Sequence, residues 1–211
     1  MIFSNREQAA RLLAEKLTAY KGRNPLILAI PRGAVPMARI IADALGGEFD
    51  VVLVRKLGAP GNPEFAIGAI DETGWAYLGP YAAMAGADDG YIERIKAREL
   101  ETLRQRRAQY SPLHPPIDPQ GRIDIVVDDG LATGSTMLAA LHALRQRMPQ
   151  KLVCAVPVAP PDTLAKVAGM ADEVVCLYAP ENFQAVGQFY VDFGQVEDAE
   201  VIALLSERKK P

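Results

Sequence analysis

Apolar residues along the chain alternate between short unbroken runs and runs with helical spacing. The unbroken runs predict buried strands at residues 26–30, 51–54, 123–127, 152–158 and 173–177. Apolar positions that recur every third or fourth residue predict helices at residues 7–20, 35–45, 91–110, 135–147, 161–170 and 196–205. Because strands and helices follow one another in turn, we predict an α/β fold with an open, mostly parallel sheet and helices on both faces.

This alternation breaks between residues 57 and 80. Residues 57–64 are rich in Gly and Pro, which is typical of a loop. Residues 65–70 and 75–78 then have the pattern of two strands joined by a turn at 71–74. We therefore expect a loop and a hairpin that project from the sheet. A connector with four prolines, at 111–121, precedes the return of the strand and helix pattern.

The composition is that of an ordinary globular protein, with 49% hydrophobic and 23% charged residues in a chain of 211. The net charge of −3 provides no broad positive field, so we expect no nucleic-acid partner. An anionic ligand would have to be bound by local charges and backbone amides. We find no signal-peptide pattern and no apolar run of about 20 residues, and so expect a cytoplasmic location without membrane contact. Cys154 and Cys176 lie in apolar runs, as core thiols of a reducing compartment do.

Residues 125–137 contain the most informative stretch of the sequence. A β-branched strand is followed by Asp128 and Asp129 and then by small and hydroxylated residues that lead into a helix. The start of a helix offers unpaired N–H groups and a partial positive charge, and small residues let a phosphate approach them. The carboxylates suit the hydroxyls of a ribose. The stretch lacks the Gly-Lys-Ser/Thr of a Walker loop and the G-x-G-x-x-G of a dinucleotide site.

Asp128-Asp129 followed by Leu131-Ala132-Thr133-Gly134 resembles the motif with which type I phosphoribosyltransferases bind 5-phosphoribosyl 1-pyrophosphate (PRPP). Locally the motif is most similar to that of adenine phosphoribosyltransferases. As a whole, the chain is similar to predicted bacterial phosphoribosyltransferases without an assigned base. That wider resemblance rests on Pro31-Arg32-Gly33, Val54-Arg55-Lys56, residues 60–65 and Val186-Gly187.

The resemblance implies one domain, residues 1–211, built from three parts. These are a core at about 22–56 and 121–180, a flexible loop and hairpin at about 57–80, and a hood at about 1–20 and 181–211. It also implies an enzyme that transfers the ribose 5-phosphate of PRPP to a nitrogenous base and releases pyrophosphate. The expected partners are therefore PRPP and a base that the sequence does not identify. Whether the chain forms a homo-oligomer is left open.

Roles for particular residues follow from the same resemblance. We expect PRPP to be bound by Asp128, Asp129, Ala132, Thr133, Gly134, Ser135 and Thr136. We expect the pyrophosphate to be bound by Arg32, Gly33, Arg55 and Lys56, and catalysis to involve Asp128, Asp129 and Lys56. Mg²⁺ is the expected cofactor, held near Asp129 through PRPP and water without a direct ligand from the protein.

Recognition of the base is the least determined part of the site. Ala132 stands where hypoxanthine-guanine enzymes have an Asp, which argues against a 6-oxopurine. Glu64 in the projecting loop is a candidate for contact with the base or for proton transfer. The aromatic candidates for stacking on a base are Phe183, Phe189 and Tyr190. The alternatives are a PRPP-binding regulator without transferase activity and, ranked last, an unrelated α/β hydrolase.

Overall fold

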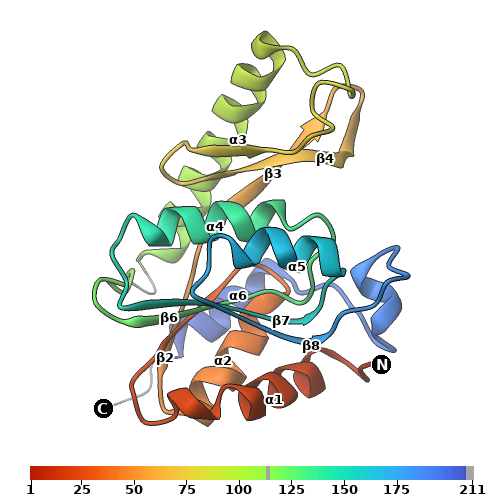
Figure 1. Cartoon of the computed structure of the whole chain (residues 1–211). Helices are drawn as coiled ribbons and strands as arrows, with labels where there is room; N and C mark the ends of the chain where they lie inside the picture. The colour runs from red at the N-terminus through yellow and green to blue at the C-terminus, as the bar shows by residue number, and fades with distance from the viewer. Residues whose placement is uncertain (113–114, 208–211) are drawn as a thin grey trace.

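The structure is a computed structural model that describes residues 1–112 and 115–207. Residues 113–114 of the predicted connector and 208–211 of the predicted hood lie outside the described residues. The larger sheet of the described chain is parallel, with the strand order β2-β1-β6-β7-β8 (Figure 1). Its strands are β1 (Leu26–Ala29), β2 (Glu48–Val51), β6 (Ile123–Val127), β7 (Lys151–Val158) and β8 (Glu173–Tyr178). The predicted α/β fold is confirmed.

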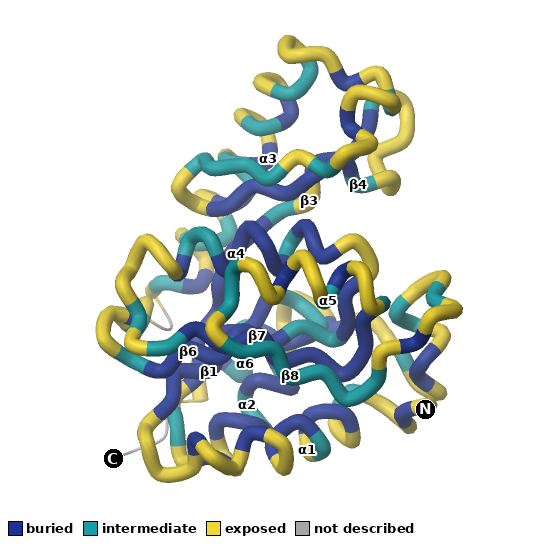
Figure 2. The backbone as a smooth tube through the Cα atoms, viewed as in Figure 1, coloured by how far each residue is buried: buried dark blue, intermediate teal, exposed yellow. Residues whose placement is uncertain are grey.

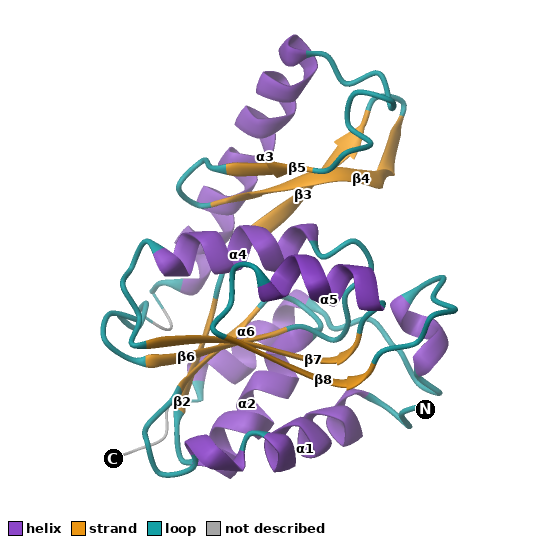
Figure 3. Cartoon of the chain, in the orientation of Figure 1, coloured by secondary structure: helices purple, strands orange, loops and turns teal. Residues whose placement is uncertain are grey.

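Helices cover both faces of this sheet, as predicted (Figure 3). One face carries α1 (Arg6–Lys16), α2 (Ala34–Leu45) and the short helix η1 (Thr18–Tyr20), and α6 (Asp198–Ser206) packs against α2. The opposite face carries α4 (Ser135–Arg145) and α5 (Pro161–Ala168). Because side chains alternate along a strand, Ile125 and Val127 of β6 join the first core while Val126 joins the second. Figure 2 shows the inner strands β6 and β7 as largely buried, whereas the edge strand β8 is intermediate throughout.

A second, antiparallel sheet stands above α4 and has the order β3-β4-β5 (Figure 1). It consists of β3 (Val54–Ala59), β4 (Asn62–Asp71) and β5 (Ala76–Leu78), and the long helix α3 (Asp89–Tyr110) packs against it. The predicted hairpin is present as β4 and β5. The predicted strand at 51–54, however, is divided between two strands. In the parallel sheet β2 ends at Val51, and in the second sheet β3 begins at Val54.

The loop predicted at 57–64 is largely strand. Leu57 pairs with Gly68, and Gly58 pairs with Ala66. A Cβ atom on Gly58 would lie 2.5 Å from the carbonyl oxygen of Pro63, and one on Gly68 would lie 2.1 Å from that of Tyr77. The glycines thus permit close approach of neighbouring backbones, a role that the sequence alone did not distinguish from a loop.

The turn after β4 attaches the second sheet to α4. Asp71 is fully buried and accepts hydrogen bonds from the amides of Thr73 (2.8 Å) and Trp75 (3.2 Å). Its second oxygen lies 3.3 Å from Nδ1 of His142 on α4. The Trp75 ring stacks on the His142 ring with 3.8 Å between centroids. The projecting sheet is therefore fixed to the helix that begins at the predicted phosphate site.

The N-terminal segment pairs with residues 189–191 beside the parallel sheet. The amide of Phe3 donates to the carbonyl of Phe189 and the amide of Val191 donates to that of Phe3, each at 2.8 Å. The short helix η2 (Val186–Phe189) leads into this pairing. Of the segments expected to form the hood, α1 and α6 pack under the sheet. We keep the name hood below for residues 186–194. Among the described residues, none of the helices has the length and apolar character that crossing a bilayer requires.

Asp124 on β6 is a buried charge-bearing residue within the apolar layer next to α4. It is in register with Leu26 of β1 and Leu152 of β7 and is fully buried. Within the described chain, neither of its carboxylate oxygens has a hydrogen-bond partner. Burial raises the pKa of Asp124 from 3.8 to about 8, although the charge of Arg122 acts in the opposite direction.

We expect Asp124→Val to reduce the loss of stability at alkaline pH. The unfolded chain releases this proton above about pH 4, whereas the folded protein retains it up to about pH 8. The wild type should therefore lose stability as the pH rises between these values. The variant should be about 1–3 kcal/mol more stable than the wild type at pH 8.

Urea unfolding at pH 5 and pH 8 measures this difference. Glu15→Gln on the exposed side of α1 serves as the control and should follow the wild type. Equal pH dependence in Asp124→Val and the wild type would contradict the assignment.

Candidate active site at the start of α4

Three loops meet at the carboxyl end of β6, the middle strand of the parallel sheet. Val127 is in register with Ala29 of β1 and Ala155 of β7, so the loops after these strands lie side by side. The amide of Ile30 donates to the carbonyl of Val127 at 3.0 Å. Ligands of parallel α/β sheets bind at this edge. The predicted residues of the Asp128 and Arg32 loops are therefore brought together.

Asp128 and Asp129 form an acidic pair directly after β6. The amide of Asp129 donates to Oδ1 of Asp128 at 2.9 Å. Burial, followed by the nearby Asp129 charge, raises the pKa of Asp128 well above its ordinary value. Burial also raises the pKa of Asp129, while the charges of Arg6 and Lys56 act to lower it. The charge of Lys56 on β3 acts to lower the pKa of both carboxylates, although no ion pair between Lys56 and either of them is present among the described residues.

The hydroxyl-rich loop that follows is held in a fixed shape. Gly134 has φ +77° and caps α4, and a Cβ atom there would lie 2.8 Å from Cγ2 of Thr163. The Thr163 hydroxyl donates to the carbonyl of Ala132 at 2.7 Å. The hydroxyl oxygens of Thr133 and Ser135 lie 3.0 Å apart. Ala132 and Thr133 are exposed and Thr136 is partly buried, whereas Gly134 and Ser135 are buried, so the loop is open to solvent mainly at Ala132 and Thr133.

Gly33 brings the loop after β1 against the acidic pair. A Cβ atom on Gly33 would lie 2.3 Å from Oδ2 of Asp129 and 3.1 Å from Nε of Arg6. The preceding peptide bond, between Pro31 and Arg32, is cis. The Arg32 guanidinium lies 3.6 Å from the carboxylate of Asp198 on α6. Gly33 is therefore in contact with the acidic pair, whereas Arg32 is oriented toward the C-terminal helix.

Arg55 and Glu64 lie apart from this arrangement. Nε of Arg55 is 2.8 Å from Oε2 of Glu99, a buried carboxylate of α3. Since adjacent side chains on a strand point to opposite faces, Arg55 packs against α3 while Lys56 acts on the acidic pair. Glu64 is exposed on β4 in the projecting sheet. Among the described residues, no hydrogen bond or ion pair joins Glu64 to the acidic pair.

Of the three aromatic candidates for stacking on a base, one contacts the site and two pack against each other. The Tyr190 hydroxyl donates to the backbone carbonyl of Asp129 at 2.6 Å, so Tyr190 contacts the site. Burial raises the pKa of Tyr190, and the nearby Asp129 charge adds to the effect, so the hydroxyl keeps its proton. Phe183 and Phe189 pack against each other, with 5.3 Å between ring centroids.

Arg6 and Phe193 contact the site and were not predicted. Nε of Arg6 lies 2.8 Å from Oδ2 of Asp129, and the side chain of each residue is about 15% exposed. The Arg6 guanidinium also lies 3.9 Å from the centroid of the Phe193 ring. The sequence contains one weak signal for the contact of Arg6. A cation in the first turn of a helix is unfavourable, and an anionic partner compensates for it.

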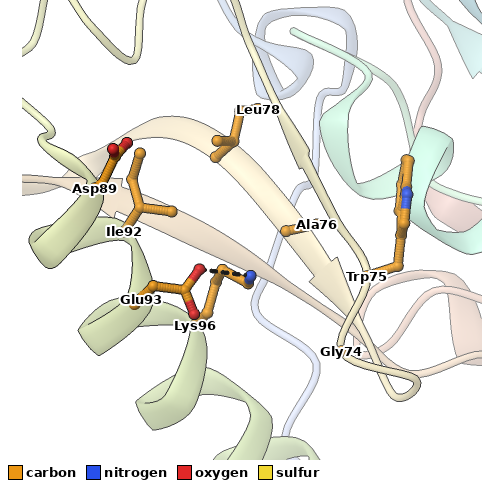
Figure 4. A pocket seen from close by; sticks show the side chains of 8 residues that line it. All are labelled: Gly74, Trp75, Ala76, Leu78, Asp89, Ile92, Glu93 and Lys96. Atoms are coloured by element: carbon orange, nitrogen blue, oxygen red, sulfur yellow. Dashed lines mark hydrogen bonds and ion pairs between the residues drawn. The ribbon is translucent and has the colours of Figure 1, made fainter.

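A separate pocket of about 420 Å³ lies in the projecting sheet, between β5 and α3 (Figure 4). Trp75 and Leu78 line it together with Glu93 and Lys96, whose charged groups pair at 2.8 Å. None of the predicted site residues lines this pocket. The acidic pair and the start of α4 are therefore the stronger candidate for chemistry.

The family model described as "Phosphoribosyl transferase domain" matches residues 2–194, which include all of the loops described above. The chain belongs to this phosphoribosyl transferase family. A Mycobacterium tuberculosis (strain H37Rv) protein named "Putative phosphoribosyl transferase" is 41% identical over 205 residues. That match covers 97% of this chain and 46% of the relative, so the chain spans about half the length of the curated phosphoribosyl transferases that it matches.

One solved structure is similar to this phosphoribosyl transferase chain over nearly its whole length. The Thermus thermophilus protein TT1426 is 48% identical, with a TM-score of 0.79. The match covers 98% of each chain. The overall fold described above is thus shared with an experimentally determined structure.

We expect Gly33→Ala to displace the Asp129 side chain. The added methyl group would overlap with Oδ2 of Asp129, which Arg6 holds in place. Such overpacking should lower the free energy of unfolding by about 1–3 kcal/mol. Thermal unfolding measures the change. Gly169→Ala is the matched control, because its φ of −71° suits alanine and its nearest neighbour would lie at 3.3 Å. Equal stability of the two variants would argue against close packing of Gly33 on Asp129.

Proposed function

We propose that this chain is a phosphoribosyltransferase that binds PRPP with Mg²⁺, transfers ribose 5-phosphate to a nitrogenous base and releases pyrophosphate. One observation carries the proposal. An acidic pair at the end of the middle strand is followed at once by a glycine and hydroxyl loop at a helix start, and the Gly33 loop contacts that pair. Membership of the phosphoribosyl transferase family supports it.

The 5-phosphate of PRPP would bind on the loop from Ala132 to Thr136. The hydroxyls of Thr133 and Ser135 lie next to the first amides of α4, and both kinds of group donate hydrogen bonds to phosphate oxygens. Gly134 adopts the left-handed conformation that this approach needs. The hydrogen bond from Thr163 to Ala132 keeps the loop in place before the ligand arrives.

The ribose hydroxyls would donate hydrogen bonds to Asp128 and Asp129, and the pyrophosphate would lie toward Gly33 and Lys56. As the glycosidic bond breaks, negative charge grows on the departing pyrophosphate, and the Lys56 ammonium on β3 would stabilise it. Arg32 would join if its contact with Asp198, 3.6 Å long and partly exposed, were exchanged for a phosphate. Arg55 is excluded from our proposal because it pairs with buried Glu99.

The donor set is compatible with magnesium held mainly by the substrate. Among the described residues, no group of three or more His, Cys, Asp or Glu side chains could hold a metal ion by itself. Two carboxylates beside a phosphate site match the way in which Mg²⁺ binds through substrate oxygens and water. Asp128 and Asp129 would face the hydrated ion, which would neutralise charge on the pyrophosphate.

A regulator that binds PRPP without turnover is the alternative, and the two are separated by a transfer assay. PRPP with Mg²⁺ should raise the melting temperature of the protein, and the rise should grow with the logarithm of the PRPP concentration above its Kd. Pyrophosphate release is then followed with a panel of purine and pyrimidine bases. Release with one base establishes the transferase, binding without release across the panel favours the regulator, and absence of binding contradicts both.

We expect Thr133→Val to weaken PRPP binding by about tenfold, since a hydrogen bond to a charged group is worth about 1.5 kcal/mol. Valine keeps the shape of threonine but removes the hydroxyl that faces Ser135. Calorimetric titration with PRPP and Mg²⁺ measures the affinity. Thr102→Val on α3, whose hydroxyl bonds the carbonyl of Arg98, is the control and should bind as the wild type does. Unchanged affinity in Thr133→Val would remove this loop from the phosphate site.

A further inference from the structure

Arg6 and the hood together hold the side chain and the backbone of Asp129. Arg6 engages the carboxylate at 2.8 Å, and the Tyr190 hydroxyl engages the backbone carbonyl at 2.6 Å. Arg6 also donates through Nη1 to the carbonyl of Gly194 at 2.6 Å. Its guanidinium lies over the Phe193 ring, which stacks in turn on Tyr190 with 4.9 Å between centroids. Three contacts thus fix the position of a single guanidinium.

These contacts join segments that are far apart in the sequence. Arg6 is the first residue of α1, Asp129 follows β6, and Gly194 lies beyond η2. The pairing of Phe3 with Phe189 and Val191 keeps the N-terminal segment in register with the hood. The position of Arg6 therefore depends on the hood, and the position of Asp129 depends on Arg6.

An acidic pair needs a cationic partner such as Arg6 if it is to accept hydrogen bonds from the hydroxyls of a ribose. Adjacent carboxylates repel each other, and both lie in a largely covered position. Oδ2 of Asp129 is engaged by Arg6 and packed against Gly33, so the second oxygen is the one that a ligand would contact. A planar guanidinium with several donors fixes a carboxylate more closely than an ammonium does.

We propose that Arg6 is a positioning residue, which holds the Asp129 carboxylate in the orientation that accepts hydrogen bonds from the ribose of PRPP. This inference rests on the proposed function, because it presumes that PRPP binds at the acidic pair. It assigns Arg6 an effect on PRPP affinity that is exerted through Asp129 and not by contact with the ligand.

A double-mutant cycle tests whether Arg6 acts through Asp129. PRPP with Mg²⁺ is titrated into the wild type, Arg6→Gln, Asp129→Asn and the double variant, and folding of each is checked by thermal unfolding. Arg6→Gln should raise the Kd for PRPP by about tenfold. In the Asp129→Asn background the same substitution should change the Kd by less than about twofold, because the group on which it acts is gone.

Two further variants separate positioning from a general structural effect. Arg6→Lys keeps the charge and one hydrogen bond, and should recover part of the affinity that Arg6→Gln loses. Arg11→Gln removes another arginine of α1, whose partner is the exposed Glu7, and should bind PRPP as the wild type does.

The outcomes distinguish this inference from the proposed function. If the wild type does not bind PRPP, the proposed function fails and this inference fails with it. If the wild type binds PRPP but Arg6→Gln binds equally well, only the role of Arg6 is overturned. If Arg6→Gln weakens binding by the same factor in both backgrounds, Arg6 acts by a route other than Asp129, and the inference is likewise wrong.

Discussion

The candidate site depends on the placement of one carboxylate between a guanidinium and a glycine. Asp129 is held by Arg6 on one side and packed against Gly33 on the other, and its backbone is held by Tyr190. Each of these neighbours belongs to a different part of the fold, namely α1, the loop after β1 and the hood. A change in any of the three would therefore alter the position of the Asp129 carboxylate. The site is a property of the whole chain and not of the motif alone.

The sequence predicted the layers of the fold because each parallel strand is an unbroken apolar run. A strand covered on both faces needs such a run. The second sheet was predicted less well. Gly58 was counted as a signal of a loop, whereas it permits contact between backbones within strands. Composition does not separate these two uses of glycine.

The site was most predictable where its residues are consecutive. Asp128 to Thr136 form one strand-to-helix connection, so their common location follows from the sequence. Arg55 and Lys56 are also adjacent, but the pleat of β3 sends one to Glu99 and leaves the other to act on the acidic pair. Arg6 lies 123 residues from Asp129 in the chain, and no local pattern reports a contact across that separation.

The contact between the N-terminal helix and the segment after η2 also bears on how the protein folds. Arg6 and Gly194, which are 188 positions apart, are joined by a direct hydrogen bond. Closing so large a loop is entropically costly, and contacts of this kind form late in folding. We therefore expect the parallel strands to pair before Arg6 reaches Gly194. Until that contact forms, the acidic pair would lack the guanidinium that holds Asp129.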